Sequence, residues 1–125
     1  MVLIIGGAYQ GKRAYAMEAY GLAQEQVFSC TQGPEIDFSK ACVDNIAEFT
    51  YGCVLRGEDP RAYFEARRQL WRDSILICAD ISCGVVPLEP ENRAWREANG
   101  RLCQYLAREA AEVHRIFCGL EQRLK

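Results

Sequence analysis

An apolar run that ends on glycines constrains the fold of this chain more than any other feature. Residues 1–5, Met-Val-Leu-Ile-Ile, form a short continuous apolar segment, which favours a buried parallel strand. The segment runs directly into Gly6 and Gly7, which are typical of a tight turn, and a helical pattern follows from Lys12 to about Leu22. The chain therefore opens with a strand, a glycine loop and a helix.

The glycine loop (residues 6–12) fits the pattern G-x-x-x-x-G-K of a phosphate-binding P-loop. Its glycines let backbone N–H groups turn toward phosphate oxygens, the helix N-terminus adds partial positive charge, and the lysine reaches the outer phosphates. The alternative is an ordinary glycine turn with a surface lysine. We predict that the loop binds the phosphates of ATP or GTP, through Gly6, Gly7, Ala8, Tyr9, Gln10, Gly11, Lys12 and Arg13.

One residue departs from the usual P-loop. Arg13 stands where Ser or Thr normally ligates Mg²⁺, and a guanidinium cannot bind a metal cation. Arg13 either points into solvent or contacts phosphate itself and replaces part of the metal's charge. A dependence on Mg²⁺ therefore does not follow from the motif.

The rest of the chain alternates between strand and helix patterns. Right-handed crossovers between such elements predict a small, mainly parallel sheet flanked by helices, an α/β fold of the P-loop NTPase type, in one domain over residues 1–125. Ligands of such sheets gather at the carboxyl ends of the strands, where both the glycine loop and Asp80 fall. Further strands are predicted at residues 26–30, 74–81 and 113–118. One further helix is predicted from Asp37 or Ser39 to Gly57, with Cys42 on its apolar face. Two others are predicted from Asp59 and Pro60 to about Trp71 and over residues 91–112.

Three charged side chains outside the loop are candidates for the site. A carboxylate at Asp80, beside a phosphate loop, can hold Mg²⁺ through water or accept the proton of an attacking hydroxyl, and its alternative role is to cap the next loop. Arg93 and Arg96 lie one turn apart on a predicted helix, so they can converge on one anionic group. The alternative is a solvated face that pairs with Glu89 or Glu97.

Charge and composition argue against several classes of partner. The formal net charge is −2 with acidic and basic residues mixed along the chain, which predicts no nucleic-acid partner. No apolar run approaches the roughly 20 residues of a membrane helix, and no signal peptide is apparent, so we expect a cytoplasmic protein. The seven cysteines include no C-x-x-C spacing, which favours buried free thiols over a zinc centre.

Three stretches together resemble a known family. Residues 3–12 are similar to its opening strand and its GGxxSGKS loop, which extends to residue 13, with Gln10 and Arg13 in place of serines. Residues 80–87 resemble its E-V-G-x-G-I-V-P, and residues 91–93, 96–97 and 100–101 continue the likeness. Cys118 and Gly119 with Lys125 are similar to its closing S-G-x-x-x-x-x-K. Residues 56–60 fit a central loop of the family. The family is the adenosylcobinamide kinase / adenosylcobinamide-phosphate guanylyltransferase family of cobalamin biosynthesis.

The resemblance implies a kinase that moves the γ-phosphoryl group of ATP or GTP to the aminopropanol hydroxyl of adenosylcobinamide. It implies that Lys12 and the loop stabilise the phosphoryl group, and that Asp80 holds the metal or accepts the proton of the hydroxyl. It also implies that nucleotide and corrinoid molecules are the partners and that the chain forms homo-oligomers. The family's middle portion, which supplies the histidine that accepts GMP, has no counterpart here. His114 lies instead in the predicted last strand, as a packing or surface residue, so guanylyl transfer is less directly implied.

Two other functions remain open at the level of sequence. One is a non-catalytic nucleotide-binding or regulatory protein derived from the same family, which Arg13 favours because the usual metal ligand is missing. The other is a kinase for a different small alcohol.

Overall fold

Six strands form one sheet within residues 1–82 and 89–125, the part of the chain that the computed structural model describes. Their order across the sheet is β2-β3-β4-β1-β5-β6, and all neighbours pair in parallel except β5 and β6. The predicted P-loop NTPase-like α/β class is therefore confirmed. The strands are β1 Val2–Gly6, β2 Val27–Ser29, β3 Cys42–Asp44, β4 Ile75–Ala79, β5 Glu112–Phe117 and β6 Leu120–Arg123.

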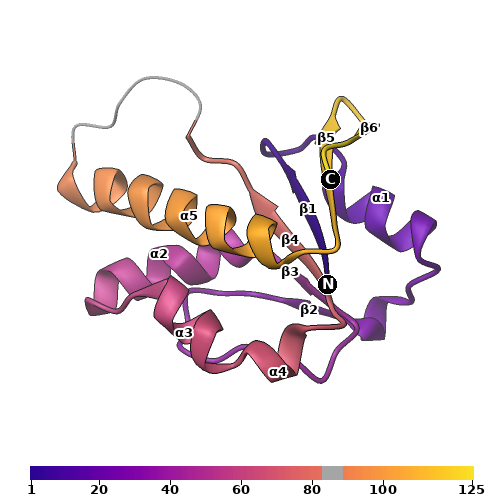
Figure 1. Cartoon of the computed structure of the whole chain (residues 1–125). Helices are drawn as coiled ribbons and strands as arrows, with labels where there is room; N and C mark the ends of the chain where they lie inside the picture. The colour runs from indigo at the N-terminus through magenta and orange to yellow at the C-terminus, as the bar shows by residue number, and fades with distance from the viewer. Residues whose placement is uncertain (83–88) are drawn as a thin grey trace.

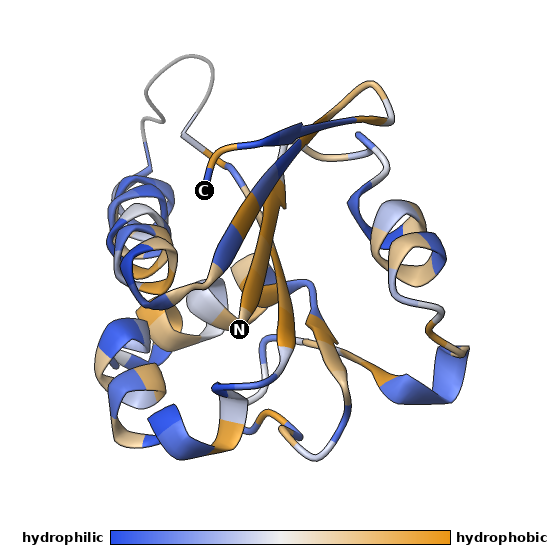
Figure 2. Cartoon of the chain, turned by 45° about the vertical axis from the view of Figure 1, so that its right-hand side comes forward, coloured by the Kyte–Doolittle hydropathy of each residue, from blue (hydrophilic) through white to orange (hydrophobic). Residues whose placement is uncertain are grey.

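Helices cover both faces of the sheet, so the molecule has three layers (Figures 1 and 2). Helix α1, Lys12–Ala19, lies on one face, and a short 3₁₀ turn, Gln24–Gln26, leads into β2. The other face carries α2 Ile46–Arg56, α3 Pro60–Ala66, α4 Arg68–Trp71 and α5 Pro90–Glu109. None of the helices in the described residues is both long and apolar enough to span a bilayer.

Both faces of the central strands are buried, which explains why β1 reads as a continuous apolar run. Leu3 of β1 and Leu76 of β4 face the larger core, under α2, α3 and α5, while Ile4 and Ile77 face the smaller core under α1. Figure 2 shows the hydrophobic strands between helices whose outer faces are polar.

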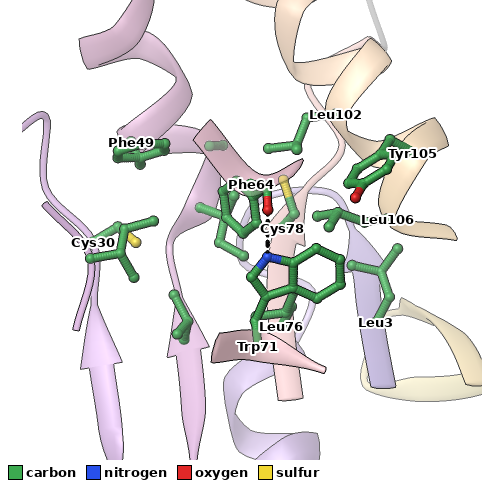
Figure 3. Packing of buried hydrophobic residues seen from close by; sticks show 14 of the residues in the cluster. Leu3, Cys30, Phe49, Phe64, Trp71, Leu76, Cys78, Leu102, Tyr105 and Leu106 are labelled. Carbon is green, nitrogen blue, oxygen red and sulfur yellow. Dashed lines mark hydrogen bonds between the residues drawn. The ribbon is translucent and has the colours of Figure 1, made fainter. Parts of the chain in front are cut away.

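Trp71 is the largest side chain in the larger core and is 1% exposed. Its ring lies 6.1 Å from that of Phe64 and 6.0 Å from that of Tyr105. The indole Nε1–H donates to the backbone oxygen of Phe64 at 2.8 Å, so its polar atom is satisfied inside the core (Figure 3).

The prediction of one helix from Asp37 or Ser39 to Gly57 is wrong in its first part. Cys42 lies in strand β3, and the helix begins only at Ile46. Asp37 accepts hydrogen bonds from the backbone N–H and the hydroxyl of Ser39, which closes a local turn instead of capping a helix. The three residues of β3 are buried between two neighbouring strands, and this tertiary setting overrode the helical spacing of the apolar residues.

Other boundaries moved by less. Asp59 caps α3 as predicted, by accepting from the backbone N–H of Arg61 at 3.0 Å, but the helix is interrupted at Arg67 before α4. The first helix ends at Ala19 instead of Leu22, and α5 spans Pro90–Glu109 instead of residues 91–112. Residues 83–87 of the stretch that resembles the family lie outside the described residues.

The chain ends in a hairpin that the sequence analysis did not predict. Strand β6 pairs antiparallel with β5 across Cys118 and Gly119, whose φ angles of 52° and 76° suit the tight turn of a hairpin. His114 therefore lies in the penultimate strand of the sequence. Cys118 is exposed and departs from the prediction of buried thiols, whereas Cys30, Cys42, Cys53 and Cys78 are buried and free.

Candidate functional site

The glycine loop joins β1 to α1 at the carboxyl edge of the parallel strands. Gly11 has a φ of 98° immediately before α1, and Tyr9, with a φ of 59°, is fully exposed at the tip of the loop. Gln10 fastens the loop to the β5–β6 turn: its side-chain oxygen accepts from the N–H of Cys118 at 2.7 Å, and its backbone oxygen accepts from that of Gly119 at 2.8 Å. These two bonds tie the loop to the β5–β6 turn.

Gly6 is required by a close approach of two strands. A Cβ atom at this position would lie 2.4 Å from the backbone oxygen of Ile116 on β5, closer than real Cβ contacts come. We expect Gly6→Ala to lower the free energy of unfolding by about 1–3 kcal/mol, the usual cost of overpacking. Urea denaturation followed by circular dichroism measures this.

Gly100→Ala is the matched control for Gly6→Ala. Gly100 lies inside α5 and a Cβ there would contact nothing within 4 Å, so alanine should stabilise the helix by roughly 0.5–1 kcal/mol. If Gly6→Ala were as stable as the wild type, the close packing of the loop against β5 would be refuted.

A cavity of about 440 Å³ opens beside the loop and α1. Lys12 lies in it, half-buried, and its Nζ donates to the backbone oxygen of Gly7 at 2.6 Å. Burial lowers the pKa of Lys12, and the charge of Asp44 opposes this shift. The residues lining the cavity are Ala8, Tyr9, Gly11, Lys12, Arg13, Ala14, Asp44, Asn45, Ala47, Glu48, Ala79, Ile81 and Trp95.

Asp44, at the carboxyl end of β3, is a residue of this cavity that the sequence analysis missed. It is 7% exposed, and its Oδ1 accepts from the backbone N–H of Asn45 at 2.7 Å. The sequence signal for this strand end is an apolar pair followed by an acid, Cys42-Val43-Asp44. The helical spacing of the neighbouring apolar residues conceals this signal.

Arg13 reaches toward Asp44, although its side chain is 38% exposed. Its Nη1 lies 3.5 Å from Asp44 Oδ2 and 3.2 Å from the hydroxyl of Ser29, so both carboxylate oxygens of Asp44 have partners. Among the described residues, no three His, Cys, Asp or Glu side chains gather as a metal site. As arranged, the residues around Lys12 do not fit the usual Mg²⁺ ion, because the hydroxyl ligand is missing and the guanidinium of Arg13 pairs with Asp44, a carboxylate of the cavity.

Asp80 follows β4 and contacts the start of the glycine loop. Its backbone N–H donates to the oxygen of Gly6 at 2.8 Å, and its Oδ1 accepts from the backbone N–H and the hydroxyl of Ser82. The residue lines a cavity of about 130 Å³ with Gly7 and Gln10, and another of about 290 Å³ with Arg96. It does not line the cavity that contains Lys12, although Ile81 borders both that cavity and the one with Arg96.

The two predicted arginines of α5 occupy different surroundings. Arg96 is half-buried, donates to the backbone oxygen of Ser82 and lines the cavity of about 290 Å³ with Asp80. Arg93 is exposed and lines none of the cavities described here. Of the pair, Arg96 is the one that the fold brings next to Asp80.

His114 lies away from the glycine loop. It is 6% exposed, with its Nδ1 2.6 Å from Glu121 Oε1 and its ring 5.9 Å from that of Tyr15. It is a packing residue, as predicted, and it lines none of the cavities described above.

A family model described as cobinamide kinase / cobinamide phosphate guanyltransferase matches residues 57–124, more than half of the chain. The match includes Asp80, Arg93 and Arg96 and begins after the glycine loop, so the loop rests on its own motif and geometry. No curated protein matches the chain.

Proposed function

Because the chain belongs to the cobinamide kinase / cobinamide phosphate guanyltransferase family, we propose that it is a kinase that transfers the γ-phosphoryl group of ATP or GTP to the aminopropanol hydroxyl of adenosylcobinamide. The observation that carries this proposal is the half-buried Lys12 beside a glycine loop, in a cavity at the carboxyl edge of a parallel sheet. A cation beside a glycine loop at such an edge suits a triphosphate.

The chemistry asks mainly for positioning and for charge stabilisation. The substrate hydroxyl attacks the γ-phosphorus, a new O–P bond forms, and the bond to the β-phosphate oxygen breaks, which leaves a nucleoside diphosphate. Lys12 and the loop N–H groups stabilise the negative charge on the transferring group. The hydroxyl loses its proton to a base, and our candidate is Asp80, which lines the cavity with Arg96; that cavity shares Ile81 with the Lys12 cavity, so a substrate that spans both could bring its hydroxyl to Asp80.

Substrate selectivity tests the corrinoid part of the proposal. We expect label from γ-labelled ATP or GTP to appear on cobinamide and not on free 1-amino-2-propanol at the same concentration, because binding energy from the rest of the substrate is needed for positioning. Equal phosphorylation of both alcohols would indicate a kinase for another small alcohol.

The position of Arg13 favours a second candidate function, in which the protein binds a nucleotide but does not turn it over. A guanidinium nitrogen of Arg13 is 3.5 Å from Asp44, a carboxylate that lines the cavity with Lys12, and the arginine thus supplies positive charge beside a carboxylate that a metal ion could otherwise bind. On either function, we propose that Arg13 replaces part of the role of Mg²⁺ at the phosphates.

Replacing Arg13 with Ser tests this role. Without Mg²⁺, we expect Arg13→Ser to weaken nucleotide binding at least about tenfold, because a hydrogen bond to a charged group contributes about 1.5–3 kcal/mol. With Mg²⁺, the new hydroxyl and the released Asp44 should restore most of the affinity. Calorimetric titration with ATP and GTP, in EDTA and in Mg²⁺, measures both effects.

Arg101→Ser is the matched control, since Arg101 is exposed on α5 and pairs with Glu97. It should change neither the affinity nor its response to Mg²⁺. An Arg13→Ser protein that behaved like this control would mean that Arg13 has no part in binding phosphate.

We do not propose guanylyl transfer through His114. The residue lies on β5, buried between Glu112 of the same strand and Glu121 of β6, and it lines none of the cavities described above.

A further inference from the structure

Two thiols meet beneath α5, beside the cavity that Asp80 lines. Cys78 lies on β4 and is fully buried, and Cys103 lies on α5 and is only partly buried. Their Sγ atoms are 3.5 Å apart. Figure 3 shows Cys78 in the core next to Leu102, the residue that precedes Cys103.

The two sulfur atoms are unequal in access. Cys103 lines the cavity of about 290 Å³, together with Asp80, Arg96 and Asn99, so a small solute can reach it. Cys78 is 0% exposed and is reached only through its neighbour. The hydrogen bond with Cys78 lowers the pKa of the Cys103 thiol, although its burial and the charge of Asp80 oppose this, so the accessible sulfur is also the more readily ionised one.

Other buried cysteines lack these features. Burial raises the pKa of Cys30 and of Cys42 to about 12 and that of Cys53 to about 11, which keeps these thiols protonated and unreactive. None of these three lines the cavities described above. The pair beneath α5 is therefore set apart by contact and by access together.

We propose that Cys78 and Cys103 form a peroxide-sensitive dithiol, in which Cys103 reacts first and Cys78 closes a reversible disulfide between β4 and α5. A disulfide needs the sulfur atoms to approach by about 1.5 Å, to the normal S–S length of about 2.05 Å. This inference does not depend on the proposed kinase activity.

The reaction balances with a hydroperoxide as the only oxidant. The Cys103 thiolate attacks one peroxide oxygen, the O–O bond breaks, and hydroxide leaves, so that Cys103 becomes a sulfenic acid. The Cys78 sulfur then attacks the Cys103 sulfur, the S–O bond breaks, and water leaves with the Cys78 proton. The two sulfur atoms lose two electrons in total, and the peroxide oxygens gain them.

Oxidation also changes the polar contacts around the pair. The Cys78 sulfur donates to Asn99 Oδ1 at 3.3 Å, and the same oxygen accepts from the hydroxyl of Thr50 at 3.0 Å. Thr50 in turn accepts from the indole of Trp95, which lines the cavity with Lys12. A disulfide has no S–H to donate, so the hydrogen bond from Cys78 to Asn99 is lost. Through Thr50 and Trp95, this bond is connected to the Lys12 cavity.

The test uses a reference protein with Cys83→Ser and Cys118→Ser, which removes one exposed thiol and one outside the described residues. After treatment with hydrogen peroxide, unfolding and alkylation, we expect the intact mass to show two unmodified sulfurs and the loss of two hydrogen atoms. A peptide map should contain the Cys78 to Cys103 crosslink, and dithiothreitol should restore both thiols.

Two further variants of the reference protein separate the roles of the sulfurs. Cys103→Ala should form no disulfide. Cys78→Ala should leave a sulfenic acid at Cys103 that dimedone captures. If both thiols of the folded reference protein remained open to alkylation after peroxide, or if the crosslink joined other cysteines, the proposal would be overturned, and this result needs no substitution inside the core.

Discussion

Replacing Trp71 with Ala lowers the free energy of unfolding by about 3–5 kcal/mol, the cost of truncating a large aromatic side chain in a packed core. The side chain is 1% exposed, packs between the rings of Phe64 and Tyr105, and satisfies its one polar atom with the Phe64 carbonyl. Natural domains have only about 5–15 kcal/mol of stability, so the loss is a large part of the total. Urea denaturation followed by circular dichroism measures it.

Trp71→Phe and Leu70→Ala complete this series. Phenylalanine keeps most of the buried area, so Trp71→Phe should lower the free energy of unfolding by less than Trp71→Ala does. Its unfolding transition can therefore still be measured if the alanine variant does not fold. Leu70 is the preceding residue and is 60% exposed, so Leu70→Ala should change stability by less than about 0.5 kcal/mol. An equally small effect at Trp71 would show that the larger core is not centred on this residue.

Replacing Lys12 with Ala should weaken the binding of ATP or GTP by at least about tenfold, because a charge-assisted bond to phosphate contributes about 1.5–3 kcal/mol. Lys12 is the cation at the start of α1, within the cavity beside the loop. Bound phosphates would add negative charge beside its half-buried ammonium group. Calorimetric titration gives the affinity of each variant.

Lys12→Met and Lys40→Ala separate charge from shape in this experiment. Methionine keeps an unbranched stem but no charge, so it should bind as poorly as alanine. Lys40 donates to the backbone oxygen of Glu25 outside the cavity, and its loss should leave the affinity unchanged. Wild-type affinity in both Lys12 variants would remove the glycine loop from the proposed site.

Patterns formed by neighbours in the chain were readable from the sequence. The apolar run of β1, the glycine loop and the capped start of α3 at Asp59 depend on local chemistry, and the structure has them where they were predicted. The interior strand predicted at residues 74–81 is present as the shorter Ile75–Ala79. The glycines, the caps and the uniform burial of parallel strands leave direct signals in composition.

Features that depend on distant contacts were not readable. Strand β3 has three residues and is defined by its two neighbouring strands, so helical spacing concealed it, and Asp44 with it. The direction of Arg13 toward Asp44 and the separation of Asp80 from the Lys12 cavity also follow from the order of the strands across the sheet. No periodicity in the sequence encodes that order.

The fate of two labels distinguishes phosphoryl transfer to cobinamide from nucleotide binding alone and from guanylyl transfer. The protein is incubated with cobinamide and GTP that carries the label on either its γ- or its α-phosphate, and Lys12→Met serves as the inactive control. We expect the γ-label to move to cobinamide with the wild-type protein only, and the α-label to appear neither on the corrinoid nor on the protein. The proposed kinase activity would be contradicted if the wild-type protein left the γ-label on nucleotide or inorganic phosphate. It would also be contradicted if Lys12→Met transferred the γ-label to cobinamide as well as the wild type does.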